Sequence, residues 1–112
     1  MKTITLPSGK SVKVPSTGDD WQLYTCSMAC GRAAASLTAA VVRAAKTIDE
    51  MASKGYRPTE AGASKLYQDV IYPVMSRYAD FGASDTEPRG VAQDALDRVI
   101  SVVTGERIRN CY

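Results

Sequence analysis

Histidine is absent from this sequence of 112 residues. Because histidine is the commonest general base near neutral pH and the commonest metal ligand, its absence argues against an enzyme and against a histidine-based metal site. Residues 1–15 also lack the apolar core of a secretory signal, and the longest mainly apolar run, 33–42, has about half the length of a bilayer span. We therefore expect a small intracellular, cytoplasmic protein with no membrane segment.

The sequence also lacks a strong excess of positive or negative charge, and its cysteines cannot all form pairs. The 14 basic and 12 acidic residues give a net charge of +2, spread along the chain, which argues against a dedicated nucleic-acid-binding protein. The 3 cysteines are an odd number, so a disulfide framework is not expected. The sequence contains no glycine-rich phosphate loop, nucleophile elbow or metal-binding helix motif, and we expect no cofactor.

The chain has the length of a single domain, 1–112, and its hydrophobic pattern predicts a mainly α fold. The predicted elements are a β-hairpin over 1–15, a long Ala-rich helix over 19–54, a helix over 59–81 that is kinked or broken at Pro73, a helix over 87–104 and a tail over 105–112. The fold becomes a small α+β fold if the tail adds a strand to the hairpin.

The hairpin prediction depends on apolar and polar residues that alternate on both sides of a turn at 7–10. Ile4, Leu6, Val12 and Val14 share one face of the two strands. Two strands alone are only marginally stable in water. We therefore expect this face to pack on the helices or on another chain.

One apolar stripe runs through the long predicted helix in steps of three or four residues. Its members are Leu23, Cys26, Cys30, Ala34, Leu37, Val41, Ala44, Ile48 and Met51. An unbroken helix over 19–54 would be roughly 50 Å long, whereas a compact chain of this size has a radius of gyration of about 13 Å. We expect the helix either to break, with Gly31 the most favourable place, or to bury its overhang in an oligomer.

Glycine and proline mark the ends of the later helices. Gly55 is the predicted stop of the long helix, and Thr59 lies where the next helix opens. Pro73 lacks the N–H that would bond back to the Asp69 carbonyl, which predicts a kink or a break there. Gly105 is the predicted end of the last helix.

Cys26 and Cys30 form the most motif-like pair, since one helical turn separates them, and Cys111 is a candidate third ligand or resolving thiol. A structural zinc ion usually takes four Cys or His ligands, and the sequence offers three. Free cysteine is also among the most buried residue types. Core packing is therefore the favoured interpretation, and a metal or redox site is the alternative.

Aromatic and arginine side chains outside the stripe are the candidate contact residues, because Tyr, Trp and Arg are enriched at protein interfaces. These candidates are Trp21, Tyr24, Tyr56, Arg57, Tyr72 and Arg77. Trp21 and Tyr24 project from the predicted long helix on the side opposite to the stripe, unless the hairpin folds over them. Tyr67 and Tyr78 are instead expected at the rim of the core.

These features favour a non-enzymatic protein that acts through protein–protein contact. It would be either a subunit of a homo-oligomeric assembly or a small adaptor or inhibitor of another protein, and its size and layout are those of many viral or mobile-element proteins. The alternative is a thiol- or metal-dependent protein that uses Cys26 and Cys30. A nucleic-acid-binding regulator is the second alternative, although the net charge of +2 argues against nucleic acid as a partner.

Overall fold

The computed structural model describes residues 1–21, 28–77 and 86–105. The elements in these ranges are β1 (Lys2–Thr5), β2 (Ser11–Val14), α1 (Met28–Ser53), α2 (Glu60–Leu66), the π-helical turn η1 (Tyr67–Ile71), α3 (Tyr72–Met75) and α4 (Thr86–Thr104). The predicted fold class is confirmed, since an N-terminal hairpin is followed by a long helix and shorter helices. The tail beyond Gly105, where a further strand was predicted, lies outside the described residues.

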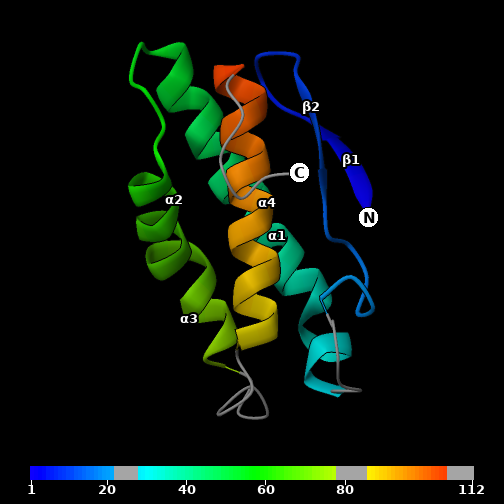
Figure 1. Ribbon diagram of the computed structural model, residues 1–112. Coiled ribbons are helices and arrows are strands. Elements are labelled where there is room, and N and C mark those ends of the chain that lie inside the picture. The colour runs from blue at the N-terminus through cyan, green and yellow to red at the C-terminus, as the bar shows by residue number, and fades with distance from the viewer. Residues whose placement is uncertain (22–27, 78–85, 106–112) are drawn as a thin grey trace.

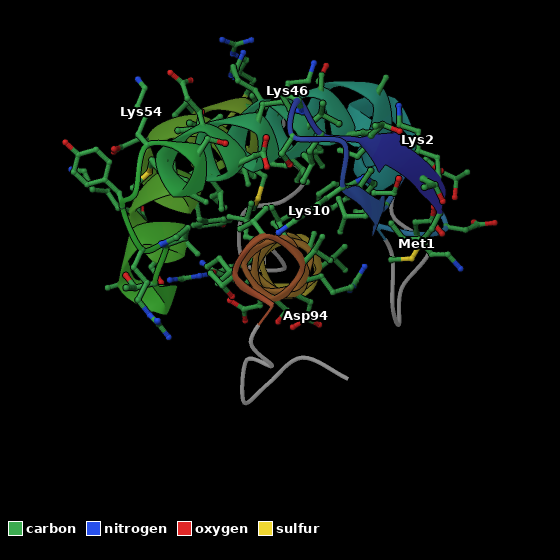
Figure 2. The ribbon with its side chains drawn as sticks, turned by 90° about the horizontal axis from the view of Figure 1, so that it is seen from above. Met1, Lys2, Lys10, Lys46, Lys54 and Asp94 are labelled. Atoms are coloured by element: carbon green, nitrogen blue, oxygen red, sulfur yellow. The ribbon has the colours of Figure 1, made fainter. Side chains whose placement is uncertain are left out.

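The helices form an up–down–up arrangement. α1 and α4 run in the same direction, and the chain returns between them through α2, η1 and α3 (Figure 1). α1 contacts α4, η1, α3 and β2, while α4 also contacts β2 and α2. The hairpin therefore lies on one side of the α1–α4 pair and α2–α3 on the other, which Figure 2 shows from above.

The hairpin packs on the helices through the face that its alternation predicts. β1 and β2 are antiparallel, with Ile4 opposite Val12, and Gly9 supplies the left-handed turn residue at φ +92°. Leu6, Val12 and Val14 are buried, and Ile4 packs against the same core. This face is thus covered by the helices of its own chain.

The inner face of α1 follows the predicted stripe over its described side chains. The buried members are Ala34, Leu37, Val41, Ala44 and Ile48. α1 also runs through Gly31 without a break. Its 26 residues correspond to about 39 Å at 1.5 Å per residue, and the longest extent of the molecule is 39 Å. A helix of this length fits within one chain, so the described part of α1 requires neither a break nor an oligomer.

The C-terminus of α1 is a Schellman motif built on Gly55, which adopts φ +87°. The Gly55 N–H donates to the Ala52 carbonyl at 3.1 Å, and the Tyr56 N–H donates to the Met51 carbonyl at 3.0 Å. The predicted glycine stop is therefore confirmed. Met51 was predicted in the core stripe, and this is wrong: its side chain is 36 % exposed at the corner where the helix ends.

The segment before α1 carries a capping box, which indicates a helical turn where the long helix was predicted to begin. The Thr17 hydroxyl accepts from the Asp20 N–H at 3.1 Å, and the Asp20 carboxylate accepts from the N–H groups of Ser16 and Thr17 at 2.9 and 3.0 Å. These N–H groups hold the pKa of the Asp20 carboxyl well below its usual range. Residues 22–27 lie outside the described residues, and α1 is described from Met28.

The break predicted near Tyr72 and Pro73 is present, because a π-helical turn ends directly before Tyr72 and a new helix begins there. In η1 the Tyr72 N–H donates to the Tyr67 carbonyl, five residues back, so the α-helical pattern is interrupted before the proline. Pro73 then occupies the first turn of α3, where its missing N–H costs no bond. α3 ends at Met75, short of the predicted end at 81, and residues 78–81 lie outside the described residues.

Candidate functional site

Two tyrosines and an arginine form a cluster at the junction of η1, α3 and α4. The Tyr67 ring lies edge-on to the Tyr72 ring, with 6.4 Å between centroids and an interplanar angle of 61°. The Arg89 guanidinium of α4 lies 5.4 Å from the centre of the Tyr67 ring. Tyr67 is buried, whereas Tyr72 is 45 % exposed and Arg89 is exposed. We call these three residues the Tyr–Arg cluster.

The π-helical turn brings the two rings of the Tyr–Arg cluster together. Residues five apart in an ordinary α-helix point about 140° away from each other, at about 100° per residue. The extra residue in the η1 turn lets Tyr72 bond back to Tyr67 directly, and both side chains then lie on one side. Single π-helical turns within α-helices frequently occur at functional sites.

Tyr67 is the fixed base of the cluster. Its side chain is 1 % exposed, and its hydroxyl donates to the Met75 sulfur at 3.4 Å. Tyr67 was expected at the core rim, and the structure places it deeper, in the core itself. Tyr72 and Arg89 therefore rest on a ring that is held from beneath by packing and by a hydrogen bond.

The other predicted contact residues do not form one site. Tyr56 is 65 % exposed and lies with the exposed Arg57 at the corner between α1 and α2, the opposite end of this layer from Tyr72 (Figure 1). Arg77 is exposed just after α3. Tyr24 lies outside the described residues. Tyr72 is thus the predicted residue that the structure places in a defined cluster.

Trp21 was predicted as a contact residue, and this is wrong because its side chain is 0 % exposed. Its indole N–H donates to the Thr38 hydroxyl at 3.1 Å, and that hydroxyl donates to the Pro15 carbonyl at 2.8 Å. Trp21 belongs to the turn that begins at Thr17, so the helical phase of α1 does not set its direction. Trp21 therefore joins the segment after the hairpin to α1 through the core.

The cysteine hypotheses lie outside what the structure describes. Cys26 and Cys111 are outside the described residues, and Cys30 is part of α1 with its side chain not described. Within the described ranges, no group of three or more His, Cys, Asp or Glu residues has the proximity to hold a metal ion. The thiol and metal interpretations stay predictions from the sequence.

A hollow of about 340 Å³ lies between the hairpin turn and α1, and its lining is Pro7, Ser8, Lys46, Asp49, Glu50 and Ser53. Asp49 is 2 % exposed, and its two carboxylate oxygens accept from the N–H and the hydroxyl of Ser8 at 3.0 and 2.6 Å. The Lys54 ammonium holds the pKa of the neighbouring Glu50 carboxyl below its usual range. Because both Asp49 oxygens accept hydrogen bonds from Ser8 in the hairpin turn, we interpret the Ser8–Asp49 contact as a latch, that is, a contact that fixes the hairpin to α1.

A second contact joins the hairpin turn to the end of α4. The Lys10 ammonium donates to the Val103 carbonyl in the last turn of α4 at 3.0 Å, and Figure 2 shows Lys10 between the hairpin and that helix. A cation at a helix C-terminus is favoured by the helix dipole. The hairpin turn is thus tied to α1 and to α4 at once.

Asp49→Ala is expected to lower the free energy of unfolding by about 1–3 kcal/mol, because it removes the charged acceptor of two hydrogen bonds from Ser8. Glu50→Ala is the matched control. It removes the adjacent carboxylate, whose contact with Lys54 is exposed, and should leave the free energy of unfolding nearly unchanged. Urea denaturation measures both variants, and equal losses would show that Asp49 is not a latch.

Comparison with known proteins gives no relative: no family model, no curated protein and no solved structure matches this chain. None of the helices in the described ranges has the length and apolarity to cross a membrane.

Arg89 is the member of the Tyr–Arg cluster that sequence reasoning missed. It is separated from Tyr67 by more than twenty residues along the chain, and no periodic pattern pairs the two. The aromatic and basic composition around Tyr72 was the available signal, and it pointed to the correct region without naming the partner of the ring. The contact depends on how α4 packs against η1, which only the folded chain shows.

Proposed function

We propose that this protein is a non-enzymatic protein–protein interaction protein, an adaptor, an inhibitor or an assembly subunit, that contacts its partner through Tyr72 and through Arg89, which lies over the Tyr67 ring. The observation that carries the proposal is the exposed Tyr72 ring, held in place on the buried Tyr67 ring. Tyrosine and arginine are the residue types on which interface binding energy most often depends. A preordered aromatic side chain also loses little rotamer freedom when a partner binds.

The distribution of apolar surface supports this region. Over the described residues, the large hydrophobic side chains that remain exposed are Met1, Met51, Tyr56 and Tyr72. Tyr72 lies on the α2–α3 layer, and Met51 and Tyr56 lie at the corner that leads into it (Figure 1). The hairpin face and the part of the α1 stripe from Ala34 to Ile48 are covered within the chain.

Self-association is one form of this proposal, and it now rests on different residues. The sequence-based argument for an oligomer used the hairpin face and the Ala-rich stripe, both of which the structure buries within one chain over the described residues. A homo-oligomer would have to form through exposed side chains such as Tyr72. A second copy and a different protein are therefore two partners for the same surface.

Site-specific photocrosslinking in the native cellular context tests the proposal. A benzophenone amino acid at position 72 should give a discrete covalent adduct, while the same group at Lys46, exposed on the outer face of α1, should give none (Figure 2). An adduct of twice the chain mass identifies a second copy, and any other discrete mass identifies a different protein. Equal labelling from both positions, or no adduct from position 72, would contradict the proposal.

A further inference from the structure

We infer that two copies of this chain pair through the outer edge of β1, so that their hairpins form one continuous antiparallel sheet across a twofold axis. This inference rests on the assembly form of the proposed function, but it uses the exposed strand β1 rather than Tyr72. The two lie on opposite sides of the α1–α4 pair (Figure 1). Each contact can therefore fail in an experiment without the other.

The outer edge of β1 carries unpaired main-chain groups. The Leu6 N–H donates to the Lys10 carbonyl at 2.7 Å, and the register continues from there along both strands without a bulge. In an antiparallel pair, successive residues point their N–H and C=O groups to opposite edges. Those of Thr3 and Thr5 therefore point away from β2. Within the described ranges, no group forms a hydrogen bond with the N–H or C=O of either threonine.

The other edge of the sheet is closed by α4. The Arg98 guanidinium donates at 3.1 Å to the Lys13 carbonyl, which points away from β1. Figure 1 shows β1 on the far side of β2 from α4, with no described element beyond it. Natural proteins commonly protect an open edge with lysine, proline or a bulge. Residues 3–6 contain none of these, and three of the four are β-branched residues that favour strands.

The open edge is complementary to a second copy of itself. Thr3 and Thr5 lie on either side of Ile4, so antiparallel pairing centred on Ile4 places Thr3 of one copy opposite Thr5 of the other. Every outward N–H and C=O of both residues then has a partner. On the exposed side the cross-strand pairs are Thr–Thr, and on the inner side the half-buried Ile4 meets its own copy. Lys2 falls opposite Leu6, so no two charges of one sign are directly opposed.

The length of β1 limits the strength of this contact. The strand has 4 residues and spans about 13 Å at about 3.3 Å per residue. A contact along one edge of this length is small compared with the roughly 1,200 Å² at which the standard range of stable interfaces begins. We therefore expect a reversible dimer that forms as the protein concentration rises.

Sedimentation velocity of the full chain from micromolar to millimolar concentration tests the inference. The wild type should pass from monomer to dimer. Thr5→Pro should weaken the dimer about tenfold or more, because it removes an outward N–H and leaves the hydrogen bonds to β2 in place. Tyr72→Ala should dimerise like the wild type. A wild type that stays monomeric would overturn the inference, and so would a dimer that Tyr72→Ala abolishes and Thr5→Pro retains, which would assign self-association to Tyr72.

Two matched double variants test the register without proline. Thr3→Glu with Thr5→Glu sets carboxylate against carboxylate in both cross-strand pairs and should weaken the dimer about tenfold or more. Thr3→Glu with Thr5→Lys sets carboxylate against ammonium in both pairs and should restore it. Both variants carry the same change opposite Lys13 within the hairpin, so a difference between them reports on the contact between copies. Equal dimerisation of the two, with equal helical spectra, would overturn pairing through β1.

Discussion

Leu37→Asp is expected to unfold the protein. Leu37 is 0 % exposed near the middle of α1, the helix that contacts α4, η1, α3 and β2. An unpaired carboxylate in this position costs several kcal/mol, against a total stability of about 5–15 kcal/mol for a typical domain. Far-UV circular dichroism should show a large loss of helix, and heating should give no cooperative transition.

Arg43→Asp is the matched control for this prediction, because it introduces the same side chain on the exposed face of the same helix. It should keep the helical spectrum of the wild type. Val41→Asp, at a position that is also 0 % exposed, should behave like Leu37→Asp. If Leu37→Asp and Arg43→Asp were equally folded, the assignment of the buried face of α1 would be wrong.

Features that depend on neighbours in the chain were predictable from the sequence. The hairpin follows from alternation around a turn, and the helix ends follow from Gly55, Thr59 and Gly105. Thr59 is an N-cap, since its hydroxyl accepts from the Gly62 N–H at 3.1 Å. The buried face of α1 follows from a period of three and four residues. In each case a few adjacent residues contain the physical cause.

The Tyr–Arg cluster was predictable only in part. Tyr72 was named because tyrosine and arginine gather in its region, but the sequence has no pattern that announces a π-helical turn. Pro73 was the visible signal of irregularity. Its missing N–H predicted a break near Tyr72, where a new helix does begin, but the π-helical form of the preceding turn was not predicted. The ring contact between Tyr67 and Tyr72 follows from that turn, and the contact with Arg89 depends on tertiary packing.

The burial of two polar side chains on α1 could not be predicted from the sequence either, because it depends on tertiary contacts. Asp49 and Thr38 are charged or polar residues on a helix, and such residues are usually solvated. Both are buried because partners from the N-terminal segment reach them: Ser8 binds Asp49, while Trp21 and Pro15 bind Thr38. These partners are distant in the sequence, so helical periodicity alone assigns neither residue to the core.

Trp21→Ala is expected to cost about 3–5 kcal/mol of stability, the range for removal of a large buried aromatic side chain. Trp21 is 0 % exposed and packs in the common core, so its loss leaves a cavity between the N-terminal segment and α1. Tyr56→Ala is the control, since it removes an aromatic side chain that is 65 % exposed and should change stability by about 0.5 kcal/mol or less. Urea denaturation followed by circular dichroism measures both variants.

Thr38→Val separates the hydrogen bonds of Trp21 from its packing. The substitution keeps the shape of the side chain but removes the two buried hydrogen bonds of the Thr38 hydroxyl, to the indole N–H and to the Pro15 carbonyl, at a cost of about 1–3 kcal/mol. Thr47→Val, on the same helix, should cost much less because its hydroxyl bonds to the Arg43 carbonyl near the surface. Trp21 is the single tryptophan of the chain, so its fluorescence reports directly on this site. If Thr38→Val left the stability unchanged, the hydrogen bonds of Thr38 with Trp21 and Pro15 would not contribute to holding the segment after the hairpin against α1.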